Sequence, residues 1–179
     1  MANATVRRPG FVAPKNTNVT GPETIVEGPF TTPASDTVYT GMAVTVNSSG
    51  VLAACAAKSK PFGIVQLRND YDWGTTRPGF YVLLPQSIDV FVIVKGRCLA
   101  AMDKSQNADS TVKGATVFAT LTAGLLCASN ALVSGEAGDY ACGTLEDIIA
   151  GNTGTGTGGA DGDPMEIDFQ PMPTVLSTS

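Results

Sequence analysis

The sequence contains no histidine among its 179 residues. Without an imidazole, the chain has no general base for a Ser-His or Cys-His nucleophile, so hydrolases of those two types are excluded. The cysteines show no Cys-x-x-Cys spacing, so no zinc set is formed. We therefore expect no enzyme activity, no metal site and no cofactor. The cysteines lie among small or apolar neighbours, and we expect buried, reduced thiols at Cys55, Cys98, Cys127 and Cys142.

Charge is also scarce, because only 15% of the residues are charged whereas 43% are hydrophobic. That balance is typical of a turn-rich β protein whose surface is largely covered by neighbours, rather than of a free monomer. The N-terminus has no long apolar run, so we expect neither a signal peptide nor a membrane span. Lys58 and Lys60 are too few for a nucleic-acid-binding face, so we expect no nucleic acid and no membrane as partner.

Basic residues are missing from the last third of the chain. Residues 1–113 hold eleven basic and eight acidic residues, a net charge of +3, whereas residues 114–179 hold eight acidic residues and no basic one, a net charge of −8. The first twenty residues carry Arg7, Arg8 and Lys15 and no acid. Two interpretations stay open: a solvated surface with random charge placement, or attraction between the N-terminus of one copy and the C-terminal third of another.

The stretch SIDVFVIVKGRCLAAM, residues 87–102, is the one around which the chain is organised. Ile88, Val90, Val92 and Val94 share one face of an extended chain, and the opposite face is also partly apolar. This pattern predicts a central strand that is covered on both sides. Gly96 then allows a bulge or a close backbone approach.

The ends of the chain have a different composition from its middle. Residues 1–36 contain five prolines, which forbid a helix and favour an extended N-terminal arm. We expect this arm to bind a neighbouring molecule and not to fold back on its own domain. The β domain is expected over residues 37–170, with a flexible Gly-rich surface loop at 151–162 and a tail at 171–179.

Two parts of the expected β domain resemble each other. GMAVTVNSSGVLAA, residues 41–54, aligns with GATVFATLTAGLLCA, residues 114–128, when one inserted residue is allowed. Gly63 and Gly143 each open the following strand, and the alternation at 90–94 then corresponds to that at 165–169. The order is a hairpin, a short strand and a long strand in both parts. It predicts two similar β units that close on one core as a small barrel or sandwich.

A polar and aromatic segment, RNDYDWGTTRPG at residues 68–79, separates two predicted strands. Tyr71 and Trp73 either anchor a buried loop or offer a stacking platform for a sugar or another partner. Asp70 and Asp72 are interpreted as solvated carboxylates. A carbohydrate-binding module that uses Tyr71 and Trp73 is therefore one alternative function.

Four segments carry a resemblance to a known family. The segments GMAVTVNSSGVLAACAAKSKPFGIV, IDVFVIVKG, GATVFATLTAGLL and YACGTLEDIIAG, in this order before a last strand, are similar to the small capsid decoration (cement) proteins of tailed bacteriophages. The resemblance covers residues 41–170. It implies a β-barrel or β-tulip-like domain that binds the outside of the capsid, often as a trimer, and clamps adjacent major capsid proteins. It brings no catalytic site.

The sequence thus predicts an all-β protein, a small β-barrel or sandwich (β-tulip-like) with an extended N-terminal arm. The expected function is that of a non-enzymatic virion protein, made in the host cytoplasm, that decorates and stabilises the capsid surface. The expected partners are the major capsid protein and further copies of the chain, as a homotrimer or another homo-oligomer. A phage tail or head-fibre base protein is the other alternative. The residues expected to bind partners are Arg7, Arg8, Phe11, Val12, Lys15, Phe30, Tyr71 and Trp73.

Overall fold

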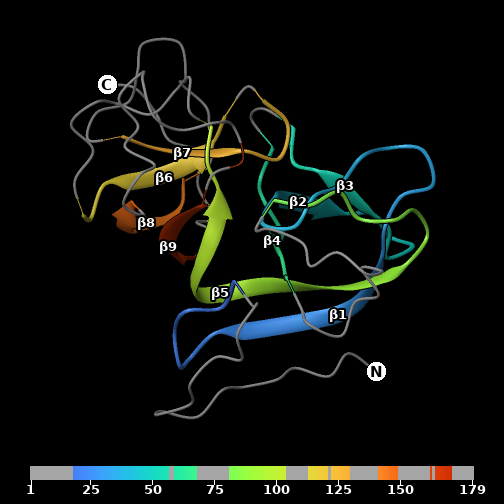
Figure 1. Ribbon diagram of the computed structural model, residues 1–179, viewed down its shortest axis with the longest axis horizontal. Helices are drawn as coiled ribbons and strands as arrows, with labels where there is room; N and C mark the ends of the chain where they lie inside the picture. Colours follow the sequence, from blue (N-terminus) through green and yellow to red (C-terminus); the bar gives the residue numbers. More distant parts are fainter. Residues whose placement is uncertain are drawn as a thin grey trace.

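A computed structural model describes residues 18–56, 59–67, 81–103, 113–120, 122–129, 141–148, 162 and 164–170. The described residues form β-strands and no helix, which confirms the predicted all-β class (Figure 1). Within them, no helix long and apolar enough to cross a membrane is found. The strands are β1 (Ile25–Thr31), β2 (Ala43–Val46), β3 (Leu52–Ala54), β4 (Gly63–Val65), β5 (Asp89–Ala101), β6 (Thr116–Ala119), β7 (Leu126–Ser129), β8 (Ala141–Ile148) and β9 (Pro164–Phe169).

Strand β5 is the longest strand and runs through both halves of the fold (Figure 1). Its first part pairs with β1 and β4, and its last six residues pair with β9. Between these parts Gly96 has a φ of +103°, a conformation that favours glycine. A Cβ atom there would lie 2.7 Å from Cα of Thr24. The predicted central strand, with a glycine at a close backbone approach, is therefore confirmed.

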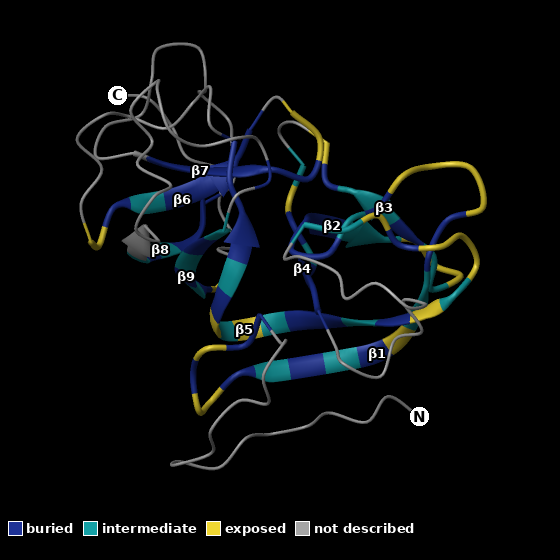
Figure 2. Cartoon of the chain, in the orientation of Figure 1, coloured by how far each residue is buried: buried dark blue, intermediate teal, exposed yellow. Residues whose placement is uncertain are grey.

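The two faces of β5 pack into different cores, and Figure 2 shows buried residues along this strand. Val90 and Val92 belong to one cluster of buried side chains, whereas Ile93 belongs to another. After Gly96 the alternation shifts by one residue, so that Cys98 and Ala100 join the cluster of Ile93. The expectation that this strand is covered on both sides is confirmed.

The fold consists of two β units with the same topology. The first unit is formed by β1 to β4 and the part of β5 before Gly96, and the second unit by the rest of β5 with β6 to β9. The strand order is β3-β2-β4-β5 in the first unit and β7-β6-β8-β9 in the second. Val44 lies opposite Gly63, and Val117 lies opposite Gly143. The predicted repeat is confirmed down to the register of its strands.

Each unit is a strongly curled antiparallel sheet, a half-barrel. An isolated parallel bridge joins Thr31 to Val51 in the first unit, and another joins Met102 to Leu126 in the second. The first bridge joins the end of β1 to the β2–β3 hairpin at the opposite edge of its sheet. The second joins the end of β5 to the β6–β7 hairpin in the same way. The two buried clusters fill the inside of these curls. The sheets thus form the small barrel-like body that the sequence predicts.

The expected N-terminal arm over residues 1–36 is wrong for residues 18–36, because they belong to the fold. Val19 bridges to Cys98, and β1 pairs with β5 along its length. Pro29 is tolerated because it lies at a register shift between Glu27 and Phe30, where the ladder needs no N–H from it. The β domain therefore includes residues 18–36. Residues 1–17 lie outside the described residues.

Asn18 joins the two units through its buried amide. Its Nδ2 donates to the carbonyl oxygens of Val65 and Leu99, at 3.0 and 3.1 Å, and its Oδ1 accepts from the N–H of Leu67 at 2.8 Å. The backbone oxygen of Asn18 accepts from the N–H of Leu99 at 2.7 Å. A fully satisfied buried amide is stabilising, and loss of one partner leaves the others without compensation.

The Gly-rich segment expected as a flexible loop at 151–162 lies outside the described residues except for Gly162. Gly162 is buried, has a φ of +90° and donates its N–H to the carbonyl oxygen of Met102 at 2.8 Å. A Cβ atom on it would run into the ring of Tyr81. The C-terminal end of this segment is therefore held against the body of the protein.

We expect Asn18→Asp to lower the free energy of unfolding by about 2–4 kcal/mol, because a carboxylate would face two carbonyl oxygens in a buried site. Asn47→Asp is the matched control. Asn47 lies in an exposed turn, and its side-chain Oδ1 accepts hydrogen bonds from the N–H groups of Ser49 and Val51. Denaturant unfolding of both variants measures the difference. Equal losses would contradict the role given to Asn18.

The four cysteines are buried and no disulfide joins them, as expected from the sequence. Burial raises the pKa of the Cys55 thiol to about 11. Burial also raises the pKa of Cys98 and of Cys142, and each is raised further by a neighbouring cysteine. The thiolate is the reactive form, so the raised pKa lowers the reactivity of Cys55, Cys98 and Cys142 in the folded protein.

We expect iodoacetamide at pH 8 to label none of the four cysteines in the native protein and all four after denaturation without reductant. Mass spectrometry counts the adducts. Rapid native labelling would contradict the burial, and two missing adducts after denaturation would reveal a disulfide.

Candidate functional site

Four side chains form a row across the outer face of the first unit. Ala43, Ile64, Ile93 and Val26 are cross-strand neighbours on β2, β4, β5 and β1. Each is at most 5% exposed, and all four belong to the same buried cluster as the interior of the second unit. This apolar row therefore covers the core of the second unit.

The second unit carries a polar row at the equivalent positions. Thr116, Thr144, Asp168 and Arg97 are cross-strand neighbours in the same order on β6, β8, β9 and β5. They are exposed or half-buried, whereas their counterparts in the first unit are buried. A polar outer face of this kind ends an array of stacked repeats. The second unit cannot cover another core as the first unit does.

Ion pairs connect the strands on this polar face. Glu146 lies 3.2 Å from Arg97 and 2.9 Å from Lys113, and Glu166 lies 3.5 Å from Arg97. A hydrogen bond from Lys113, aided by the charge of Arg97, holds the pKa of the Glu146 carboxyl below its usual value. Part of the acidic charge of residues 114–179 is thus paired with basic side chains of the same chain, and this part is not left for a contact with another copy.

Apolar side chains at the edge of the first unit's core are partly exposed, whereas those at equivalent positions in the second unit are buried. Among the described residues, the buried cluster of the second unit has one partly exposed apolar neighbour, whereas that of the first unit has eight. Strand register identifies equivalent positions, and four of them are half-buried in the first unit and buried in the second. These pairs are Val46 and Ala119, Ala54 and Ala128, Phe62 and Cys142, and Val94 and Phe169.

We call the partly exposed apolar side chains around the first core the open rim. Two aromatic pairs stand out in it. The rings of Phe30 and Phe62 meet edge to face with centroids 5.3 Å apart, and those of Tyr39 and Tyr81 stack with centroids 4.5 Å apart. Half-buried aromatic side chains are typical of protein-binding surfaces. The open rim consists of Phe30, Tyr39, Val46, Ala54, Phe62, Tyr81, Ile88 and Val94.

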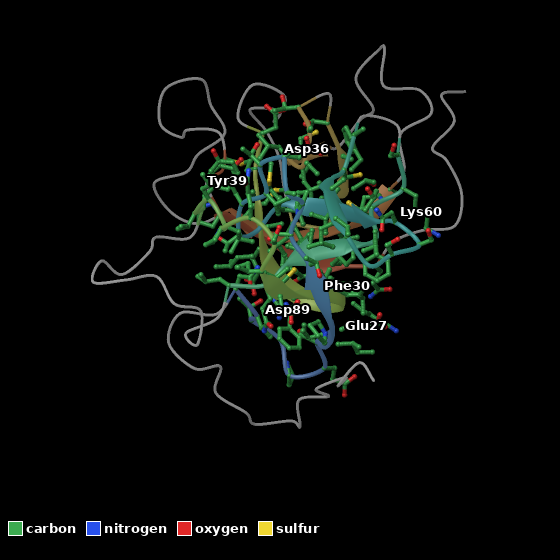
Figure 3. The ribbon with its side chains drawn as sticks, turned by 90° about the vertical axis from the view of Figure 1, so that its right-hand side faces the viewer. Glu27, Phe30, Asp36, Tyr39, Lys60 and Asp89 are labelled. Atoms are coloured by element: carbon green, nitrogen blue, oxygen red, sulfur yellow. The ribbon has the colours of Figure 1, made fainter. Side chains whose placement is uncertain are left out.

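Charged side chains border the open rim (Figure 3). Glu27 shares the face of Phe30, because it pairs with Val92 as Phe30 pairs with Val90. Asp36, Asp89 and Lys60 are exposed near its aromatic members (Figure 3). Three acids and one base give these four groups a net charge of −2. The rim therefore suits a partner that is apolar and basic.

Of the residues expected to bind partners, Phe30 lies in the open rim. The others lie outside the described residues, namely Arg7, Arg8, Phe11, Val12, Lys15, Tyr71 and Trp73. Sequence reasoning missed Tyr39, Phe62 and Tyr81. Only the repeat contained a signal for Phe62, because Cys142 occupies the matching position before the glycine and is a much smaller side chain.

The described residues offer a surface for binding. Among them, no three His, Cys, Asp or Glu side chains gather as they would around a metal ion. Buried apolar side chains fill the interiors of both units. No known protein family matches this chain, and no curated protein matches it significantly in sequence.

The ion pairs of Glu146 make a small contribution to the pH dependence of stability. Because its pKa is lowered in the folded state, the contribution is present above the unfolded pKa and is lost as the pH falls through the folded value. We expect Glu146→Gln to remove less than about 1 kcal/mol at pH 7 and almost nothing at pH 2. Urea unfolding at both pH values measures this, with Glu23→Gln as an exposed control. An equal loss at both pH values would contradict it.

Proposed function

We propose that this chain is a non-enzymatic structural protein of a virion, which decorates the outer capsid surface and clamps neighbouring major capsid proteins. The resemblance of its four segments to phage decoration proteins motivates the assignment to a capsid. The observation that carries a binding function is the open rim. An apolar surface that is covered in one unit and exposed in its twin is best explained by a partner.

The mechanism is burial of apolar surface at many sites. Each Å² of apolar surface removed from water contributes about 25 cal/mol, so one rim gives a modest contact. A capsid presents many equivalent sites, and copies that are linked to one another bind it with an increased effective concentration. Weak individual contacts then hold the shell together against internal pressure.

Rigidity of the double unit suits this role. Strand β5 is continuous between the two units. The side-chain amide of Asn18 links β4 to β5, because it donates to the carbonyl oxygens of Val65 and Leu99. A clamp transmits force between neighbours only when it does not itself deform. The shared strand and the common core give the protein that stiffness.

The direct test uses heads of the virus that encodes this chain, assembled without it. We expect purified protein to bind them at a fixed, saturable ratio to the major capsid protein, and to raise the temperature at which they release DNA. Sedimentation, electron microscopy and a dye-release assay measure these effects. Heads that never bind the protein would refute the proposal. Density confined to the tail or to a fibre base would favour that alternative.

Two variants of neighbouring residues on β2 test whether the open rim takes part. Val46→Asp places a charge in the rim, whereas Thr45→Asp places the same charge on the opposite face of the strand, and both residues are half-buried. We expect at least tenfold weaker binding to heads for Val46→Asp and little change for Thr45→Asp, with similar unfolding midpoints. Equal binding of both variants would exclude the rim.

A further inference from the structure

We infer that the open rim of one copy binds residues 7–15 of a neighbouring copy, so that the protein assembles head to tail. This inference assigns the rim to a neighbouring copy, so the rim would serve capsid binding by linking copies to one another. It does not depend on the assignment to a capsid. It rests on the exposure of the rim, on its charge and on where the described chain begins.

The polar face of another copy is a poor cover for the rim. In the second unit, the core is covered by Ala43, Ile64, Ile93 and Val26. If the second unit of one copy covered the first unit of another copy in the same way, its polar row would lie over the apolar rim. That row consists of Thr116, Thr144, Asp168 and Arg97. Burial of a carboxylate and a guanidinium against apolar side chains is costly. A continued stack of units is therefore disfavoured.

Contact between two rims is also disfavoured. Glu27, Asp36 and Asp89 border the rim, with Lys60 as the one cation of the four charged groups in Figure 3. Two rims face to face would bring acidic groups together, which is unfavourable. The rim needs an apolar partner with positive charge.

Residues 7–15, RRPGFVAPK, have this chemistry. Phe11 and Val12 are apolar and bulky, and Arg7, Arg8 and Lys15 flank them. No acidic residue occurs before Glu23. Pro9 and Pro14 restrict the unbound segment, which lowers the entropy lost when it is ordered on a partner.

The described chain begins at the end of β5 that lies away from the rim. Asn18–Thr20 run antiparallel to β5 beside Leu99 and Arg97. Followed toward the N-terminus, they lead in the direction of Ala101. The rim lies toward Asp89, at the other end of β5. The described chain therefore begins on the side of the fold away from the rim of its own chain.

The contact would be heterologous, because two different surfaces meet. Such contacts close into a ring when the rotation between copies allows it. The aromatic side chains of the open rim and Phe11 would supply most of the affinity, since each exposed ion pair contributes only about 0–1 kcal/mol. Charge would mainly set which surfaces meet.

Charge exchange tests the inference on the full-length protein. One variant reverses the rim by Asp36→Lys with Asp89→Lys, and the other reverses the segment by Arg7→Glu with Arg8→Glu. We expect the unchanged protein to self-associate in sedimentation velocity and each variant to do so about tenfold more weakly or worse. An equimolar mixture of the two variants should associate again, because each reversed surface then meets its complement in the other chain.

The control is Glu23→Lys, which changes an exposed acid near Gly96 and away from the rim, and should leave self-association unchanged. Circular dichroism and unfolding midpoints confirm that every variant folds. A protein that stays monomeric, or variants that associate normally, would overturn the inference. Weakened variants whose mixture does not recover would show that the segment binds elsewhere. Failure of head binding with intact self-association would leave this inference standing and refute the capsid assignment instead.

Discussion

The burial of one cross-strand row against the second unit is the contact on which the rest of the structure depends. Ala43, Ile64, Ile93 and Val26 belong to the first unit but pack into the core of the second. Without the first unit, apolar side chains in the core of the second unit would be exposed to water. The two halves form one folding unit, although each has a complete set of strands.

Strand β5 makes this arrangement possible because it serves both units. Its change of phase at Gly96 turns the side chains that follow toward the core that Ile93 already reaches. A regular strand would send Cys98 and Ala100 to the other core. One residue with positive φ thus lets a single strand end one curl and begin the next. Asn18 supports the same junction from outside.

Much of the fold could be predicted from the sequence, because periodicity and turn residues are local signals. The alternation around Val92, the turn at Asn47–Gly50 and the repeat of 41–54 in 114–128 all correspond to observed strands and register. The boundary at residue 36 failed because proline content does not reveal that Pro29 sits at a bulge.

The candidate site was much harder to predict than the fold. Whether Phe62 and Val46 are exposed depends on what covers them in space, and their sequence neighbours carry no such information. Only Phe30 was foreseen among the rim residues, and it was placed in an arm. The rim became visible by comparison of equivalent positions, which requires the register of both sheets.

The repeat also gives this protein an internal reference for its own evolution. Val46 and Ala119 occupy the same place in two copies of one topology, yet only the first touches solvent. Changes at the second are constrained by packing alone, whereas changes at the first are constrained by whatever the molecule meets. Among natural variants, twin positions should therefore drift at different rates. The ratio of the two substitution rates would separate selection for folding from selection for assembly.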